Sequence, residues 1–143
     1  MKSDRMFLIK TLSEPENGEK MLHEFAEIFD VGDEENYAVE DIGGLDYVFL
    51  RFTEYKVEKV CKVLDKYIRY TVEDITDRII FGDEGELKYI IKGKEFKVFF
   101  NNFRLEVTRL DDVLDKIIKK GIEALDEVDR FVLTSSENRN EIN

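Results

Sequence analysis

The sequence lacks the residue patterns that several classes of protein need. Among its 143 residues there are one cysteine, one proline and no tryptophan. A lone cysteine, Cys61, cannot form an internal disulfide, so nothing indicates the disulfide framework of small secreted domains. No apolar run reaches the roughly 18 residues that cross a bilayer, and the N-terminus lacks the long apolar segment of a signal peptide. We therefore expect a cytoplasmic protein that makes no membrane contact.

The motifs of common catalytic and cofactor sites are also missing. No serine lies in a G-x-S-x-G elbow, and the glycines form neither a G-x-G-x-x-G pattern nor a phosphate-binding loop. The only histidine, His23, is one helical turn from Glu27 but lacks the second histidine of the zinc-protease pattern. Asp111, Asp112 and Asp115 are explained by a helix N-terminus, where the helix dipole favours negative charge. We predict a non-enzymatic protein without cofactor or metal, and rank an enzyme with carboxylate-bound Mg²⁺ last.

The residues that are present favour a folded domain. Hydrophobic residues make up 43% and charged residues 38% of the chain, which is too much apolar side chain for a disordered protein. The many Lys and Glu residues and the absence of Gln are typical of heat-adapted proteins. We expect one domain over residues 1–143, with a seam at 82–85 and a flexible tail at 135–143. The chain shows no internal repeat.

The first half of the chain predicts alternating strands and helices. Gly43-Gly44 joins two β-type runs and permits the positive φ angles of a tight hairpin. Ser13 and Thr53 are placed to cap the two helices. The predicted elements are strand 6–11, helix 13–30, strands 37–42 and 45–53, helix 53–69 and strand 70–81. This order is the ferredoxin-like βαββαβ arrangement.

The second half predicts an antiparallel meander and a covering helix. Three β-type runs, 86–91, 95–100 and 103–108, are separated by short polar links that suit hairpins. A helix capped by Thr108 then runs at least to Asp126. Residues 128–134 suit either a helix or a strand, and the sequence leaves this open. The predicted fold class is α+β.

The negative charge is concentrated in one segment. The segment from Glu14 to Asp46 contains twelve acidic residues and one basic residue, Lys20, so it accounts for the whole net charge of -11. Such a segment is either a solvated face or a surface that docks a basic partner or mimics nucleic acid. We expect an interaction or assembly module, with partner-binding residues Glu24, Glu27, Asp30, Asp33, Glu34 and Glu35.

The alternative is an RNA-binding or RNA-processing accessory module. Lysines interleaved with aromatic residues suit single-stranded RNA, although a net charge of -11 disfavours it. The residues of this alternative face are Lys59, Lys62, Lys66, Arg69, Lys88, Lys92 and Lys94. They favour RNA only if they share one surface without intervening acids.

Self-association is a further expectation. In the last helix, apolar residues alternate at spacings of four and three, which is the pattern of a coiled-coil seam. The residues in this pattern are Leu110, Leu114, Ile117, Gly121, Ala124, Val128 and Phe131. The run covers about three heptads, so packing on the meander is the preferred interpretation, and a homo-oligomer or larger assembly is the second.

Overall fold

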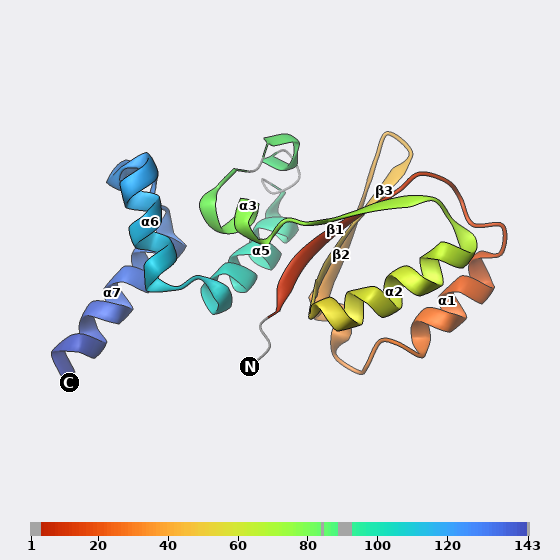
Figure 1. Cartoon of the computed structure of the whole chain (residues 1–143), viewed down its shortest axis with the longest axis horizontal. Coiled ribbons are helices and arrows are strands. Elements are labelled where there is room, and N and C mark those ends of the chain that lie inside the picture. Colours follow the sequence, from red (N-terminus) through yellow and green to blue (C-terminus); the bar gives the residue numbers. More distant parts are fainter. Residues whose placement is uncertain (1–3, 84, 89–92, 143) are drawn as a thin grey trace. The chain divides into compact units, whose positions relative to one another are not determined.

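The computed structural model describes residues 4–83, 85–88 and 93–142. The chain divides into two compact units, unit 1 (Met1–Thr76) and unit 2 (Asp77–Asn143). The described residues form one four-stranded antiparallel sheet and six α-helices, so the fold is α+β. The whole sheet lies in unit 1 (Figure 1).

Unit 1 is a sheet with two helices on one of its faces. The predicted order of strand, helix, strand, strand, helix and strand is the observed order. The antiparallel strands lie in the order β2-β3-β1-β4, and α1 and α2 lie side by side on the same face (Figure 1). The elements are β1 (Arg5–Thr11), α1 (Gly18–Ala26), the 3-10 helix η1 (Asp33–Asn36), β2 (Tyr37–Ile42), β3 (Leu45–Phe52), α2 (Glu54–Tyr67) and β4 (Tyr70–Asp74).

The hairpin between β2 and β3 confirms the prediction from Gly43-Gly44. The φ angles of these two glycines are 63° and 85°, which few other residues adopt. Asp41 supports the turn because its carboxylate accepts the Gly44 N–H at 3.1 Å. The two-residue turn fixes the cross-strand register, which pairs Tyr37 with Leu50, Val39 with Val48, and Asp41 with Asp46.

The two helices of unit 1 begin differently from each other. Thr53 caps α2 as predicted, because its hydroxyl accepts the Lys56 N–H at 3.4 Å. The cap predicted for α1 is wrong: Asn17 caps it and accepts the Lys20 N–H at 3.1 Å. Ser13 instead accepts the Arg69 N–H at 2.9 Å. Helix α1 therefore starts later than its sequence pattern predicts.

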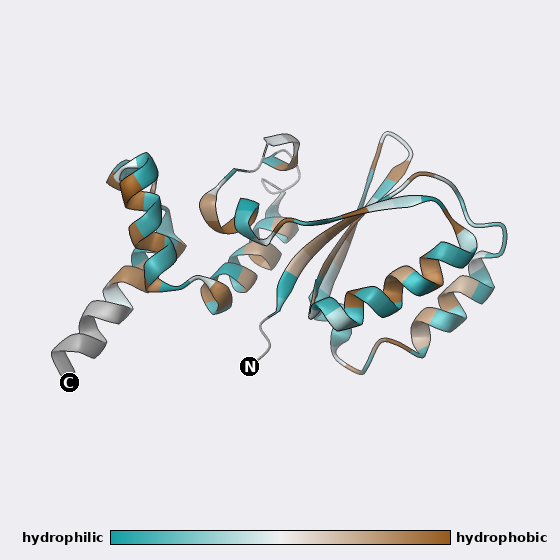
Figure 2. Cartoon of the chain, in the orientation of Figure 1, coloured by the Kyte–Doolittle hydropathy of each residue, from teal (hydrophilic) through white to brown (hydrophobic). Residues whose placement is uncertain are grey.

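The core of unit 1 is built by the sheet and α2. Phe7 and Ile9 of β1 and Leu50 and Phe52 of β3 are buried against a face of α2. Figure 2 shows apolar residues recurring along α2 at helical spacing. The buried residues of α2 are Val57, Val60, Val63 and Leu64, whereas α1 has no buried residue.

The two edge strands of the sheet carry the same sequence pattern. Strand β2 begins Tyr-Ala-Val-Glu-Asp at Tyr37, and β4 reads Tyr-Thr-Val-Glu-Asp from Tyr70. Both strands follow a helix and both occupy an edge of the sheet. The shared pattern covers only these five positions, and a helix and loop of different length precede each copy.

Unit 2 is helical, and the predicted meander is wrong. Runs 95–100 and 103–108 form the single helix α5 (Lys94–Val107), and the predicted turn at Asn101-Asn102 lies inside it. Burial of Phe100, Phe103 and Arg104 has helical spacing, so packing of one face overrides the β propensity of the aromatic residues. In the run 86–91, Leu87 lies in the 3-10 helix η2 (Gly85–Leu87), and residues 89–91 lie outside the described residues.

Helices elsewhere in unit 2 replace two other predicted elements. The strand predicted over 70–81 ends at Asp74 and is followed by α3 (Thr76–Phe81). The long covering helix is two helices, because Gly121, with a φ of 85°, ends the first. These helices are α6 (Leu110–Lys120) and α7 (Glu127–Ile142), with the 3-10 helix η3 (Ile122–Ala124) between them. Residues 128–134 are therefore helical.

A buried ionic network connects three helices of unit 2. Asp129 is only 1% exposed, and its carboxylate accepts hydrogen bonds from Arg104 at 3.1 Å and Lys116 at 2.7 Å. Asp126 also pairs with the Arg104 guanidinium. Burial alone would raise the pKa of Asp126, but the hydrogen bonds from Arg104 and from the Asp129 N–H, together with the nearby positive charges, outweigh it and lower the pKa to about 2. The two carboxylates balance the two buried cations, as buried charge requires.

Candidate binding cleft

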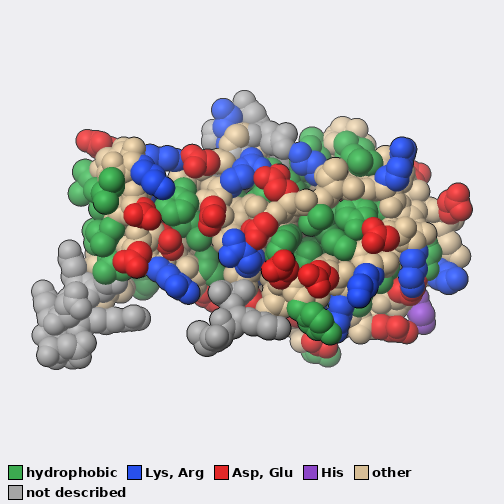
Figure 3. Space-filling model, viewed as in Figure 1, with side chains coloured by type: hydrophobic (Ala, Val, Ile, Leu, Met, Phe, Trp, Pro, Cys, Tyr) green, Lys and Arg blue, Asp and Glu red, His purple; other side chains and the backbone are tan. Residues whose placement is uncertain are grey.

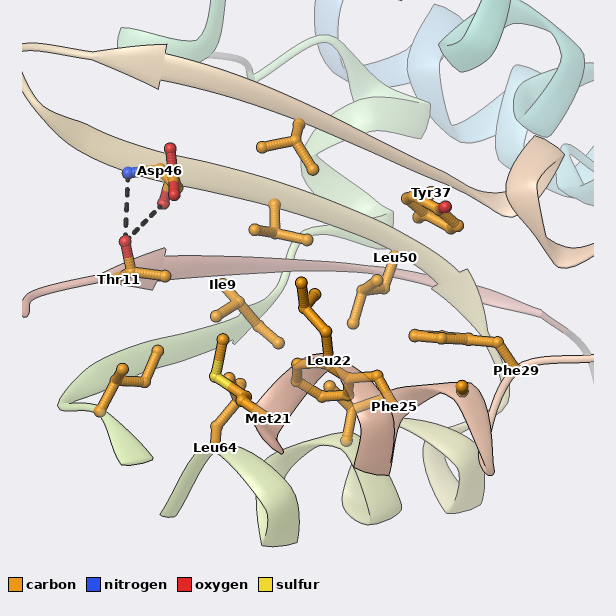
Figure 4. Close-up of a pocket in the computed structure, with 15 residues that line it drawn as sticks. Ile9, Thr11, Met21, Leu22, Phe25, Phe29, Tyr37, Asp46, Leu50 and Leu64 are labelled. Carbon is orange, nitrogen blue, oxygen red and sulfur yellow. Dashed lines mark hydrogen bonds between the residues drawn. The ribbon is translucent and has the colours of Figure 1, made fainter. Parts of the chain in front are cut away.

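An apolar cleft lies in unit 1 between α1 and the β2–β3 hairpin. Its volume is about 410 Å³, which is within the range of ligand pockets. Figure 4 shows side chains from α1 facing those of the strands across this space. The lining residues are Ile9, Thr11, Met21, Leu22, Phe25, Ala26, Phe29, Tyr37, Val39, Asp46, Val48, Leu50, Val60, Leu64 and Ile68.

The cleft exists because α1 covers the sheet incompletely. Met21, Leu22 and Phe25 have the spacing of one helix face, and this face is directed towards the sheet (Figure 4). Leu22 is nevertheless 65% exposed, and Val39 on β2 is 51% exposed. Helix α1 packs against α2 rather than closely on β2 and β3. Apolar side chains on both walls of the cleft are therefore left partly in water.

One end of the cleft is aromatic. Phe29 and Tyr37 lie there (Figure 4), with ring centroids 5.6 Å apart. Phe29 also contacts Phe52 of the core at 5.5 Å between centroids. These contacts fix the segment after α1 to the sheet, so the cleft is closed by rigid aromatic groups at this end.

The opposite end of the cleft is polar and acidic. The Thr11 hydroxyl accepts the Asp46 N–H at 3.1 Å, and Asp46 lines the cleft (Figure 4). Asp41 lies directly opposite Asp46 in the hairpin register. Side chains two residues apart on a strand share a face, so Asp41 lies on the same face as Val39. Two carboxylates on one cross-strand pair repel each other and favour a bound cation between them.

Three of the six predicted partner-binding acids are held by lysines of α2. Glu24 accepts a hydrogen bond from Lys66 at 2.6 Å and another from the Tyr67 hydroxyl. The hydrogen bond from Lys66 is the main cause of the lowered pKa of Glu24. Lys56 contacts Asp30, at 3.3 Å, and Asp33. Burial alone would raise the pKa of Asp33, but the bond and charge of Lys56 and the hydrogen bond from the Asp30 N–H together outweigh it, so the pKa is lowered.

The other three predicted acids are exposed to solvent. Glu27 follows α1, and Glu34 and Glu35 lie in η1. Glu34 accepts the Gly32 N–H at 3.1 Å, which leaves its carboxylate at the surface. The predicted six residues therefore form two groups: three that connect the α1 region to α2, and three that face solvent.

The predicted lysine face is interrupted by acids. On α2, Glu58 and Asp65 alternate with Lys59, Lys62 and Lys66, and Lys66 is paired with Glu24. Figure 3 shows acidic and basic side chains interspersed over unit 1 in this view. Lys59 lies 4.6 Å from the centre of the Tyr55 ring. Arg69 follows α2, Lys88 and Lys94 belong to unit 2, and Lys92 lies outside the described residues.

Other candidate groups add no chemistry to the cleft. Within the described part of the chain, no cluster of three His, Cys, Asp or Glu residues could hold a metal. Burial raises the pKa of the Cys61 thiol, which is partly buried against the core. Among the described helices, none is both long and apolar enough to cross a membrane.

The predicted set contains none of the residues that line the cleft, and among the acids it lacks Asp46 and the cross-strand neighbour Asp41. Both lie in the acidic segment, but the predicted set was chosen from the helix and the loop after it. The sequence does contain a signal for this pair: a two-residue Gly-Gly turn fixes the pairing of the fifth residue of β2 with the second of β3.

No known family matches the chain, and no curated protein or solved structure is significantly similar to it.

Proposed function

We propose that unit 1 is a non-enzymatic protein-interaction module that docks a basic segment of a partner protein. The cleft receives apolar side chains of that segment, and Asp41 and Asp46 bind an adjacent lysine or arginine. The exposed acids Glu27, Glu34 and Glu35 extend the negative field around the docked segment. The proposal uses the acidic segment from Glu14 to Asp46 as one surface with an apolar centre.

The observation that carries the proposal is the carboxylate of Asp46 at one end of an otherwise apolar cleft, with Asp41 opposite it in the strand register. Burying one aliphatic side chain is worth roughly 1.5–3 kcal/mol, so an apolar contact alone gives weak binding. A neighbouring cation adds electrostatic selectivity and a faster encounter. Unit 1 has 18 acidic and 10 basic residues, so it carries -8 of the net charge of -11, which favours basic partners over nucleic acid.

We assign unit 1 to the ferredoxin-like topology as part of this proposal. The order βαββαβ and the strand order β2-β3-β1-β4 support the assignment. This topology hosts many unrelated functions, so it carries no argument for the partner. The topology matters for the proposal only because it places both helices on the same sheet face, each over one half of it.

Selection from a random peptide library tests the proposal. The full-length protein is immobilised, and bound peptides are sequenced after several rounds at low salt. We expect enrichment of peptides in which Lys or Arg is next to Leu, Ile or Phe. Binding should weaken by about tenfold or more between 50 and 500 mM salt, because exposed charges are screened.

Two controls separate this outcome from unspecific attraction. The variant Val39→Phe fills the cleft and keeps the net charge, so selected peptides should lose most of their affinity for it. A labelled single-stranded RNA of 20 nucleotides should not compete with the peptides. Enrichment of basic peptides without apolar residues, or equal binding to Val39→Phe, would contradict the proposal, and competition by RNA would favour the nucleic-acid alternative.

A further inference from the structure

Helix α6 carries an apolar line that unit 2 leaves in water. Leu114 and Ile118 are one turn apart and are 42% and 82% exposed. Ile122, in η3 after the helix end at Gly121, is also 59% exposed. The helix meets the core of unit 2 through Val113 and Lys116, which lie on another face. Much of this line is therefore exposed to solvent rather than packed within the unit.

The charges of α6 are divided between its two ends. Asp111, Asp112 and Asp115 lie in its first half, and Lys119 and Lys120 lie in its last turn. Asp111, Asp115 and Lys119 are spaced by four residues, so they form a second line beside Leu114 and Ile118. Asp111, Asp115 and Lys119 are all exposed. Along this second line, the sign of the charge changes from negative to positive towards the C-terminus.

We propose that α6 binds α6 of a second copy of this chain in antiparallel orientation. In that arrangement the acidic first half of each helix lies beside the basic second half of the other, and Asp115 faces Lys119 across the pair. The two apolar lines then cover each other. A parallel pair would place like charges together, so the charge division selects the antiparallel one.

The expected association is weak. A stable dimer buries about 800 Å² per partner, and two partly exposed apolar side chains on one short helix provide only part of this area. We expect a Kd on the order of 10–100 µM, as for a weak and transient interface. Self-association by α6 does not involve unit 1, so its outcome is independent of the proposed peptide cleft.

Sedimentation velocity of the full chain between about 1 and 300 µM tests the proposal. The wild-type protein should change from monomer to dimer over this range. Ile118→Asp should remain monomeric at every concentration, and its exposed position keeps the fold intact. Val98→Asp, at an exposed apolar residue of α5, is the matched control and should dimerise like the wild type.

Charge reversal tests the orientation. Asp115→Lys alone should weaken dimerisation by about tenfold or more, because the introduced lysine would face Lys119 of the other copy. The double variant Asp115→Lys with Lys119→Asp should restore it, because opposite charges meet again. A wild-type monomer at 300 µM, a dimer of Ile118→Asp, or no recovery in the double variant would each overturn the proposal.

Discussion

The two halves of unit 1 repeat one plan with different packing. In each half a helix leads into an edge strand that begins with Tyr-x-Val-Glu-Asp. Helix α2 has 14 residues and buries four of them, whereas α1 has nine and buries none. Tyr70 of the α2 half donates hydrogen bonds to Asp65 at 2.7 Å and to the Cys61 carbonyl at 3.3 Å. Its counterpart Tyr37 lines the cleft and is 39% exposed.

With the proposed function, this difference means that α2 mainly stabilises unit 1 and that α1 mainly forms the binding site. The α2 half closes over the sheet and contributes the buried helix residues of the core, whereas Met21, Phe25, Ile28 and Phe29 of the α1 half pack against this core only partly buried. The α1 half leaves apolar surface in water, which costs stability unless a ligand covers it. The cleft thus lies between the sheet and α1, the less tightly packed of the two helices. Substitutions in the α2 half should mainly lower the free energy of unfolding, and substitutions in the α1 half should mainly lower peptide affinity.

The largest expected difference is in the free energy of unfolding. Leu64→Ala in α2 should lower it by about 2–5 kcal/mol, because a buried leucine leaves a cavity. Leu22→Ala in α1 should lower it by less than about 1 kcal/mol, because Leu22 is mostly exposed. Urea denaturation followed by tyrosine fluorescence measures this, since five of the six tyrosines lie in unit 1. Equal losses of unfolding free energy in the two variants would contradict the different roles of α2 and α1.

A matched pair of substitutions on the edge strands should show which half of unit 1 binds the peptide. Val39→Phe fills the cleft and should weaken peptide binding by about tenfold to a hundredfold, because the apolar contacts are lost. Val72→Phe, at the equivalent position of β4, should leave binding unchanged. Isothermal titration calorimetry with one selected peptide gives both values. A loss of affinity in Val72→Phe would show that the α2 half also takes part.

The acidic pair should show a conflict between stability and binding. Asp46→Asn removes the repulsion from Asp41, so we expect stability to rise by a few tenths of a kcal/mol. Peptide affinity should fall by about tenfold, because one carboxylate no longer meets the cation. The comparison variant is Glu40→Gln, whose side chain points to the other face of β2. Equal effects of the two variants would indicate a general charge effect.

The smallest expected effect is the loss of stability around α1 at acidic pH. The folded-state pKa values of Glu24 and Asp33 lie below the ordinary values of 4.5 and 3.8. Their ion pairs therefore stabilise unit 1 fully above these values, and the stabilisation is lost as the pH falls through the folded-state values. Because both pairs connect the α1 region to α2, amide protection in α1 should decrease before that in α2. Hydrogen exchange at pH 6 and pH 3, corrected for intrinsic rates, measures the order, and a simultaneous loss would contradict it.

Local sequence signals predicted most of unit 1. The Gly43-Gly44 hairpin and the Thr53 cap depend on neighbouring residues only, and both are observed. The cap of α1 was misplaced because Ser13 binds Arg69, which is distant in sequence. In unit 2, the aromatic residues of α5 have β propensity, and only the burial of Phe100 and Phe103 on one face decides for a helix.

The cleft could not be predicted from the sequence. The apolar spacing of Met21, Leu22 and Phe25 predicts a helix face that packs against the sheet, and it gives no sign that the packing is incomplete. The lysines that bind the acidic residues Glu24 and Asp33 are also distant in sequence. What the sequence did contain was the register that places Asp41 opposite Asp46, because the turn type determines it.

An NMR titration with three ligands of equal chain length tests the central claim most directly. Octylammonium, octanol and octanoate are added separately, below their micelle concentrations, to the ¹⁵N-labelled full chain. We predict saturable shifts at the amides of Val39, Asp46 and Val48 with octylammonium, weaker binding of octanol, and none of octanoate, while Val72 stays unchanged. Octanoate that binds as tightly as octylammonium, or shifts centred on Val72, would contradict an apolar cleft with an acidic end in the α1 half.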